Sequence, residues 1–146
     1  MDVAHVLNDL LRPLIGAGLN LRWRLFAMLQ IGRDEGRQNP ATIQRDQGFL
    51  NLVDQAVSLN YADREFDLTA LSHQLALSKR QIQRRLKALL GRTPSEYIRT
   101  YRLHESLQLL QRGMSVSEAA RAVGFSSQAY FASCFKAEFD QTPSDF

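Results

Sequence analysis

The stretch "LTALSHQLALSKRQIQRRLK", residues 68–87, decides the fold expected for this chain. Its apolar residues recur at steps of three and four on both sides of the break "ALS", which is the spacing of a buried helix face. Asp67, just before the stretch, and Ser78, at the end of the break, have side chains that cap helix N-termini. The stretch therefore predicts a short helix, a tight turn and a longer helix.

A near copy of this pattern follows 48–49 residues later. The copy is "VSEAARAVGFSSQAYFASCFK", residues 116–136, and it aligns once one residue is inserted after the turn. The matched pairs are Leu75 with Val123, Leu77 with Phe125, Ser78 with Ser126, Ile82 with Phe131, Leu86 with Phe135 and Lys87 with Lys136. Each copy has the order of a helix-turn-helix unit, whose second helix can enter a major groove of DNA.

One continuous helix is expected between the two copies. Thr93 can cap it, Pro94 suits its first position and Glu96 completes a capping box, while Gly113 ends it. At about 1.5 Å per residue this helix spans about 27 Å. Successive major grooves on one side of B-DNA lie about 34 Å apart, so the linker helix has the right size to place the two units in adjacent grooves.

The composition agrees with an all-helical chain. Apolar residues make up 45% of the sequence, which supports a core, and no alternating segment bounded by turn residues stands out as a strand. We expect an all-α fold with two helix-turn-helix units joined by a long linker helix and preceded by a short helical extension, with a helix starting near Arg45 after the turn-rich segment 32–42. The expected ranges are 1–47 for the extension, 48–146 for the two-unit domain, and 67–90, 94–112 and 115–138 for the first unit, the linker helix and the second unit.

Positive charge gathers in one central block. Residues 79–112 hold 9 Lys and Arg against 2 Asp and Glu, whereas residues 1–78 hold 7 against 9 and residues 113–146 hold 2 against 4. A local basic block favours a polyanionic partner, with nucleic acid as the first candidate. A solvated helix surface is the alternative that charge alone leaves open.

Several other classes of protein are disfavoured. The single cysteine, Cys134, forms no internal disulfide, and together with the lack of a signal peptide it indicates a reducing, cytoplasmic setting. No apolar run reaches the roughly 20 residues of a membrane helix, so we expect no membrane contact. His5, His73 and His104 lack metal-ligand spacing, and no nucleophile–base pair or phosphate loop is evident. We therefore expect no metal, no cofactor and no enzymatic activity.

Residues 48–146 resemble the DNA-binding domain of AraC/XylS-type transcriptional regulators. The stretches that carry the resemblance are "LSHQLALSKRQIQRRLKALLGRTPSEYIRTYRL", "SVSEAARAVGFSSQAYFASCFKAEF" and "QTPSDF". The resemblance implies a bacterial, nucleoid-associated regulator, usually an activator, which reads double-stranded promoter DNA with two units and acts near RNA polymerase. Two departures stand out, since Ala76 and Asp140 occupy positions where many relatives have glycine.

In the first unit, the helix over 79–90 predicts the residues that contact bases. With Ile82, Leu86 and Leu89 toward the core, the outward positions hold side chains that can bind guanine or adenine edges. These candidates, which the resemblance also implies, are Arg80, Gln83 and Arg84. Arg85 lies nearer the core boundary, where its stem can pack while its head reaches a phosphate.

In the second unit, the outward positions are nearly neutral. They are Gln128, Ala129, Ala132 and Ser133. Relatives often have arginine where this chain has Ser133, so we expect the first unit to supply more affinity than the second. The candidate phosphate contacts of the chain are Ser78, Lys79, Arg85, Lys87, Thr93, Arg99, Ser127 and Lys136, and Arg102 is expected to add to the positive field. Tyr97, Tyr101, Leu107 and Leu110 form a stripe on the linker helix that we interpret as core.

The first 47 residues permit two interpretations. "NDLLRPL", residues 8–14, followed by an amphipathic helix, resembles the tail of a response-regulator receiver domain, which would make the chain the C-terminal part of a larger two-component protein. Alternatively, residues 1–31 form a helical pair that packs or forms a homodimer. For the whole chain, a non-specific nucleic-acid-binding protein and a protein-interaction bundle remain the alternatives to a sequence-specific regulator.

Overall fold

The computed structural model describes residues 40–146, apart from the side chain of Ile43, and in this range every element is helical. The elements are α3 (Pro40–Asn60), α4 (Leu68–Leu75), α5 (Lys79–Leu90), α6 (Pro94–Gln111), α7 (Val116–Ala122), α8 (Gln128–Phe139) and the 3₁₀ turn η2 (Pro143–Asp145). The interpretations of the receiver-like segment 8–14 and of the self-associating pair 1–31 lie outside the described residues.

The start of α3 corrects the sequence-based expectation. The helix begins at Pro40, not near Arg45, and so takes the last residues of the segment 32–42 that was expected to be a linker. Proline suits the first position of a helix because its fixed φ is already helical and its missing N–H has no partner there. α3 also runs without a break across position 47, where the extension was expected to end.

α5 and α6 start at the capping residues that the sequence predicts, and α7 is capped in the same way. The hydroxyls of Ser78, Thr93 and Ser115 accept hydrogen bonds from the backbone N–H three residues on, at 3.1, 3.2 and 3.2 Å, and each of the three forms a capping box. α8 is capped by Ser127, whose Oγ accepts from the Tyr130 N–H at 3.2 Å. Ser127, rather than Ser126, is therefore the structural counterpart of Ser78, and the inserted residue of the second copy lies in its turn.

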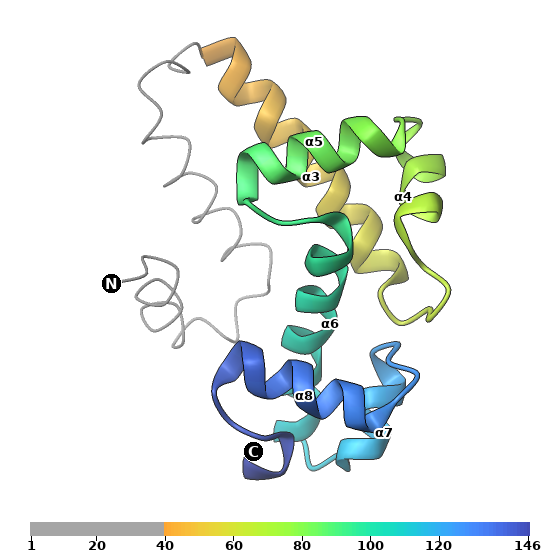
Figure 1. Ribbon diagram of the computed structural model, residues 1–146, viewed down its shortest axis with the longest axis vertical. Helices are drawn as coiled ribbons and strands as arrows, with labels where there is room; N and C mark the ends of the chain where they lie inside the picture. The colour runs from red at the N-terminus through yellow and green to blue at the C-terminus, as the bar shows by residue number, and fades with distance from the viewer. Residues whose placement is uncertain (1–39) are drawn as a thin grey trace.

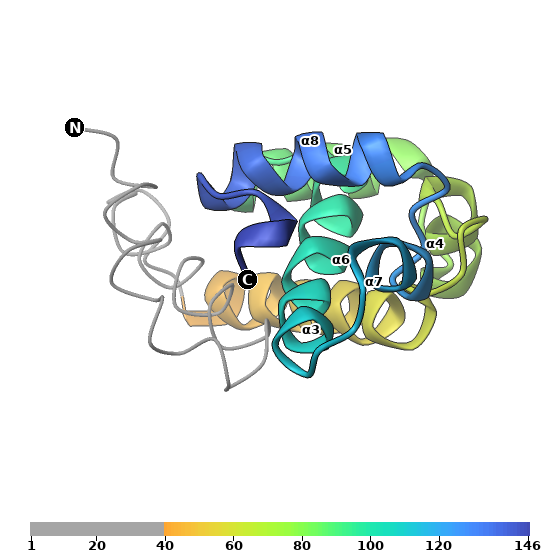
Figure 2. The same ribbon diagram turned by 90° about the horizontal axis from the view of Figure 1, so that it is seen from below.

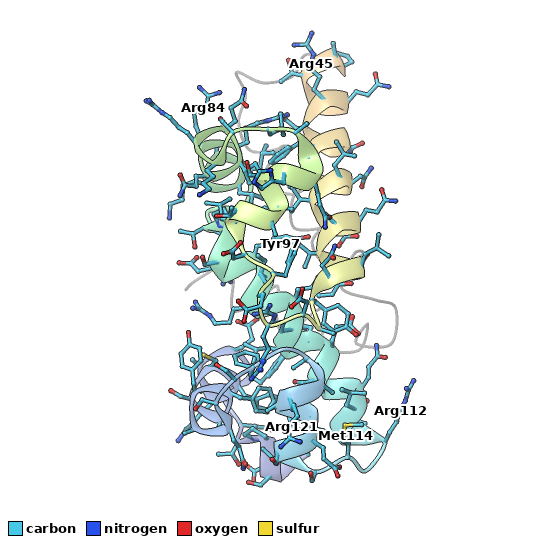
Figure 3. All side chains as sticks on the ribbon, turned by 90° about the vertical axis from the view of Figure 1, so that its right-hand side faces the viewer. Arg45, Arg84, Tyr97, Arg112, Met114 and Arg121 are labelled. Carbon is cyan, nitrogen blue, oxygen red and sulfur yellow. The ribbon has the colours of Figure 1, made fainter. Side chains whose placement is uncertain are left out.

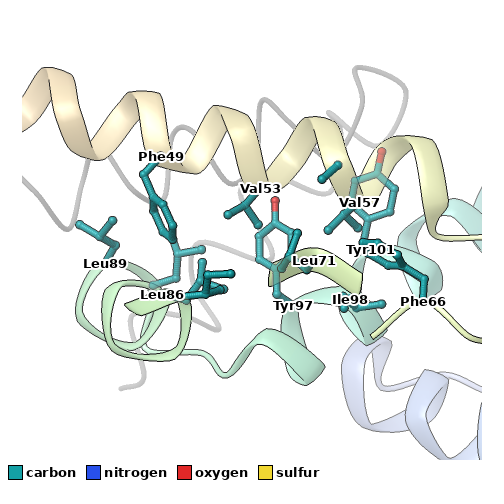
Figure 4. Close-up of a cluster of buried hydrophobic side chains, with 13 residues drawn as sticks. Phe49, Val53, Val57, Phe66, Leu71, Leu86, Leu89, Tyr97, Ile98 and Tyr101 are labelled. Atoms are coloured by element: carbon teal, nitrogen blue, oxygen red, sulfur yellow. The ribbon is translucent and has the colours of Figure 1, made fainter. Parts of the chain in front are cut away.

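The long helix α6 shares its length between two cores. Its first turns contribute Tyr97, Ile98 and Tyr101 to a cluster with α3, α4 and α5, in which Phe49, Val53 and Val57 of α3 face α5 and α6 (Figure 4). Its later turns contribute Leu103, Leu107 and Leu110 to a second cluster with α7 and α8. The stripe of Tyr97, Tyr101, Leu107 and Leu110 is buried, which confirms its interpretation as core.

One polar contact lies inside the first core. The Tyr97 hydroxyl donates to Oδ1 of Asp54 at 3.4 Å, and both side chains are buried. Burial, followed by the negative charge of Asp54, raises the pKa of Tyr97 well above its ordinary value. The phenol therefore keeps its proton and remains a donor, which satisfies a polar group that burial would otherwise destabilise.

The two outer helices of the units lie on one side of the molecule. α5 and α8 are separated along the long axis, with α6 running between the units (Figure 1). Seen along that axis, α8 lies in front of α5 on the same side, while α3 lies on the opposite side (Figure 2). The fold thus presents two comparable helices in one direction.

Candidate nucleic-acid interface

The outward face of α5 is basic and exposed. Ile82 and Leu86 are fully buried, whereas Arg80, Gln83 and Arg84 on the outward side of the helix are exposed. The Arg84 side chain projects from α5 on the side away from α3 (Figure 3). Guanidinium groups free of intramolecular partners can form paired hydrogen bonds with guanine O6 and N7, so this face can read base edges.

The cationic rim of α5 divides into two kinds of side chain. Lys79 and Lys87 are exposed, and the Lys87 ammonium lies 3.4 Å from the Gly91 carbonyl at the end of its helix. Arg85 instead turns toward α3, where its guanidinium carbon lies 4.1 Å from the centre of the Phe49 ring and its Nη2 lies 3.9 Å from Asp46. This cation–π contact fastens α5 to α3, so the head group of Arg85 is already engaged within the fold.

The outward face of α8 is small and almost neutral. Gln128, Ala129 and Ser133 are exposed, whereas Ala132 is half-buried. Lys136 is the one cation on this helix, and it is exposed. Such a face can contact thymine methyl groups or donate single hydrogen bonds to bases and phosphates, but it supplies little Coulomb attraction.

The sequence reasoning missed Tyr130, at the N-terminal end of α8. Its side chain is 52% exposed, its hydroxyl accepts a 3.3 Å hydrogen bond from Nη1 of Arg99, and its ring centre lies 5.9 Å from that of Phe125. A helical wheel could have identified it, because it is an aromatic residue at an outward position. The contact joins α6 to α8 beside the neutral face and holds the guanidinium of Arg99 there.

Arg102 has a different role from the one expected. Rather than adding to an exposed positive field, its Nε donates to the Tyr61 carbonyl at 2.8 Å and its Nη2 donates to the carbonyls of Asp63 and Phe66 at 2.8 and 3.3 Å. Burial lowers the pKa of Arg102, and the neighbouring Asp63 opposes that shift. The sequence carries no signal for this role, since the acceptors are backbone groups 36–41 residues away.

The candidate phosphate contacts at helix starts are exposed. Ser78, Thr93 and Ser127 each stand at the N-terminus of a helix whose first N–H groups carry partial positive charge. The hydroxyls of all three accept from their own helices, and that of Ser78 also donates to Oε1 of Gln81 at 3.2 Å, so Thr93 and Ser127 are the two whose protons can be donated directly to an anion. These three positions suit phosphate oxygens.

Other kinds of site are not found between residues 40 and 146. In this range no group of three His, Cys, Asp or Glu side chains could hold a metal ion. His104 instead forms a pair with Glu138, with 3.2 Å between Nε2 and Oε1. No helix of the described range is long and apolar enough to cross a membrane.

Residues 71–146 match the family model described as "Helix-turn-helix domain". Among curated proteins, the chain is 35% identical over 97 residues to the transcriptional activator RhaS of Escherichia coli, which covers 66% of this chain and 34% of RhaS. It is also 34% identical over 102 residues to histidine kinase P4 of Formosa agariphila, covering 69% of this chain but 7% of that protein. The matched part of the chain thus spans about a third of RhaS and less than a tenth of the kinase.

Solved structures share the fold. A transcriptional regulator with an AraC-type DNA-binding domain from Chromobacterium violaceum is 33% identical, with a TM-score of 0.60 over 68% of this chain and 91% of that one. The C-terminal domain of the response regulator yesN from Fusobacterium nucleatum is 27% identical, with a TM-score of 0.62 over 67% of this chain and 96% of that one. The DNA-binding domain of AdpA, solved with a target DNA, is 26% identical, with a TM-score of 0.59 over 66% of this chain and 86% of that one.

These matches fall on the two-unit helical domain described above, and RhaS, AdpA and the Chromobacterium violaceum protein are transcription regulators by name. The expectation that this domain is not an enzyme agrees with the matches to these regulators. The resemblance noted on the repeated stretches is therefore confirmed: the chain belongs to the AraC-type family of helix-turn-helix DNA-binding transcription regulators.

Proposed function

We propose that this chain is a sequence-specific reader of double-stranded promoter DNA that places α5 and α8 in successive major grooves and activates transcription. The observation that carries the proposal is the presentation of both helices on one side of the molecule by the single helix α6 (Figures 1 and 2). The 18 residues of α6 span about 27 Å, and the units at its two ends extend this toward the groove repeat of about 34 Å.

The side chains then take distinct roles. Arg80, Gln83 and Arg84 contact base edges from α5, and on α8 the base-facing group consists of Gln128, Ala129, Ala132 and Ser133, with Tyr130 added beside them. Phosphate contacts come from Ser78, Lys79, Lys87, Thr93, Arg99, Ser127 and Lys136. Arg85 belongs to the same set, with its guanidinium also in contact with Phe49 and Asp46 on α3.

A binding titration tests this proposal. A DNA selected by the full chain and a random DNA of equal length are titrated at two salt concentrations, with fluorescence anisotropy as the readout. A specific reader prefers its selected site by about 10³-fold or more, although both affinities fall with salt. Equal affinities that fall together would indicate a non-specific nucleic-acid-binding protein, and an absence of binding to any DNA would indicate a protein-interaction bundle.

We also propose that the domain serves as the output part of a larger two-component protein in the bacterial cytoplasm and contacts RNA polymerase at the promoter. The matches to a histidine kinase and to a response-regulator C-terminal domain support the first point, and the similarity to an activator supports the second. In vitro transcription from the selected site, with and without the chain, tests activation, and a decrease in transcript would instead indicate a repressor.

Self-association through residues 1–31 is a separate proposal. Light scattering on the full chain and on the same chain with residues 1–31 removed tests it. A full chain that is dimeric and a truncated chain that is monomeric would support the proposal. The same oligomeric state in both chains, whether monomer or dimer, would contradict it.

A further inference from the structure

The loop between α3 and α4, residues 61–66, lies at the junction of the two units. Its first residue, Tyr61, packs against both hydrophobic clusters, and its ring centre lies 5.4 Å from that of Tyr101 on α6. Among the described helices, α3, α4 and α5 pack extensively on one another or on α6, but none of them packs extensively on α7 or α8. The loop is thus a point of direct contact between the units, through Tyr61 and Ala62.

Arg102 fastens the loop to the shared helix. It donates hydrogen bonds to the carbonyls of Tyr61, Asp63 and Phe66, which together cover the length of the loop. Charged donors form stronger hydrogen bonds than neutral ones, and a half-buried guanidinium is less screened than an exposed one. The loop therefore cannot shift relative to α6 without breaking three contacts.

Gly124 brings the second unit against the same point. A Cβ at this position would lie 2.7 Å from the Tyr61 carbonyl oxygen, 3.3 Å from that of Ala62 and 3.1 Å from Nε of Arg102. The closest of these is a backbone atom, which cannot move aside without moving the loop. The turn between α7 and α8 thus packs directly against the loop that Arg102 holds. A methyl group added at Gly124 would push the second unit away from this loop.

The contact between Gly124 and the loop lies beside a groove on the surface. This groove runs between the loop and the second unit, and it is lined by residues of both, including Asp63, Arg64, Arg121 and Gln128. The groove leaves the contact at Gly124 open on one side. This contact with the loop therefore adds to the packing of α7 and α8 on Leu103, Leu107 and Leu110 of α6 in fixing the orientation of the second unit.

We infer that Arg102 and Gly124 are positioning residues that fix the placement of α8 relative to α5, and thereby select the base-pair spacing between the two half-sites. The inference rests on the proposed two-groove reading. One inserted base pair turns a half-site by about 34–36°, because a turn of B-DNA holds about 10–10.5 base pairs. A rigid junction would reject that rotation and a loosened one would accept it.

The first experiment measures affinity for probes in which the spacing of the selected site is changed by single base pairs. The affinity of the unaltered chain should fall by about tenfold or more when one base pair is inserted or deleted, an effect comparable with that of one mismatched base pair. Gly124→Ala and Arg102→Met should reduce that loss to below about threefold or move the optimum by a base pair.

Two controls isolate the junction. Gly113→Ala imposes the same kind of backbone cost, since Gly113 has φ +89 and Gly124 has φ +93, but a Cβ at Gly113 meets nothing within 4 Å. Arg112→Met removes an exposed arginine at the end of α6. Both controls should keep the wild-type spacing profile. A profile that is unchanged in both junction variants overturns the inference while leaving the proposed function intact.

The second experiment needs no DNA and so separates the two proposals. Spin labels at A88C on α5 and A137C on α8, equivalent exposed positions, are placed in a Cys134→Ser background and their distance distribution is measured. Gly124→Ala and Arg102→Met should broaden or shift the distribution relative to Gly113→Ala and Arg112→Met. Identical distributions overturn the inference. If no probe is preferred over random DNA, the proposed function fails, and this measurement alone decides whether the junction is rigid.

Discussion

The two units place different chemistry on the same scaffold. Both have a capped outer helix of 12 residues with two fully buried apolar residues four positions apart, Ile82 and Leu86 in α5 and Phe131 and Phe135 in α8. At equivalent outward positions, however, α5 has Arg80 and Arg84 where α8 has Ala129 and Ser133. Packing thus fixes where a side chain points, and the outward residues remain free to determine what it contacts.

The cores differ as well. Both contain aromatic and aliphatic side chains, and the first is completed by α3. In the second unit the rings pack on one another, with Phe131 and Phe135 at 5.7 Å and Phe135 and Phe139 at 4.6 Å between ring centres. Offset and edge-on ring pairs stabilise a core beyond their buried area. The second unit, which is not covered by α3, thus gains stability from ring–ring contacts within its core.

The largest expected effect concerns the independence of these cores. Phe131→Ala should lower the free energy of unfolding by about 3–5 kcal/mol, because it removes a fully buried ring and leaves a cavity. Amide hydrogen exchange should accelerate in α7 and α8 more than in α3 and α5. Leu86→Ala, with an expected loss of about 2–5 kcal/mol, should show the reverse pattern. Uniform acceleration in both variants would mean that the two clusters unfold as one.

The next effect compares equivalent outward residues. Arg84→Ala should cost about 1–3 kcal/mol of binding free energy at its cognate base pair and relax the preference there. Ser133→Ala should cost less, because a hydroxyl makes a single neutral hydrogen bond. Affinity for sites carrying each base substitution is the measurement. A greater loss for Ser133→Ala would overturn the asymmetry, and an equal loss on every sequence would make Arg84 a phosphate contact.

A third test uses the position at which both helices carry a lysine. Lys87 and Lys136 are equivalent and exposed, so each should contribute one phosphate contact. Replacing either lysine with alanine should reduce the slope of log K against log salt by about 0.9, whatever the sequence of the site. If the Lys136 variant kept the original slope, the end of α8 would not reach the DNA backbone.

The smallest expected effect is on stability, at two residues whose backbone is left-handed. Ala76 ends α4 with φ 53 and Asp140 ends α8 with φ 59, both left-handed. Since this conformation is unfavourable for alanine, Ala76→Gly should stabilise the protein by about 0.5–1 kcal/mol in urea unfolding, after the entropic cost of glycine. Asp140→Gly should gain less, because aspartate tolerates this region better. A destabilising Ala76→Gly would show that the strain is already relieved.

Local signals explain what the sequence predicted. The cap residues Ser78, Thr93 and Ser115, and the apolar steps behind them, act within one or two turns, so α4 to α8 appear within a residue or two of their expected ends. The exposed face of α5 follows from the same periodicity. The backbone of Ala76, a position where many relatives have glycine, also has a left-handed conformation.

Contacts between distant segments explain what the sequence could not predict. In the sequence nothing distinguishes Arg102 from the other cations of the linker helix. Its role depends on acceptors about 40 residues earlier in the chain, which only the folded structure brings close to it. The contact of Arg85 with the Phe49 ring was also beyond prediction, because Phe49 belongs to a helix whose start the sequence misplaced. Tyr130 could have been found from its outward position, although its contact with Arg99 could not.

The central claim is that one chain reads two adjacent grooves unequally, and sequencing a random DNA pool after selection on the full chain tests it most directly. The account predicts two blocks of preferred bases with centres about 10–10.5 base pairs apart. The block that loses its preference in Arg84→Ala should be the stronger one. A single block, two equal blocks, or a stronger block that depends on Ser133 would contradict the account.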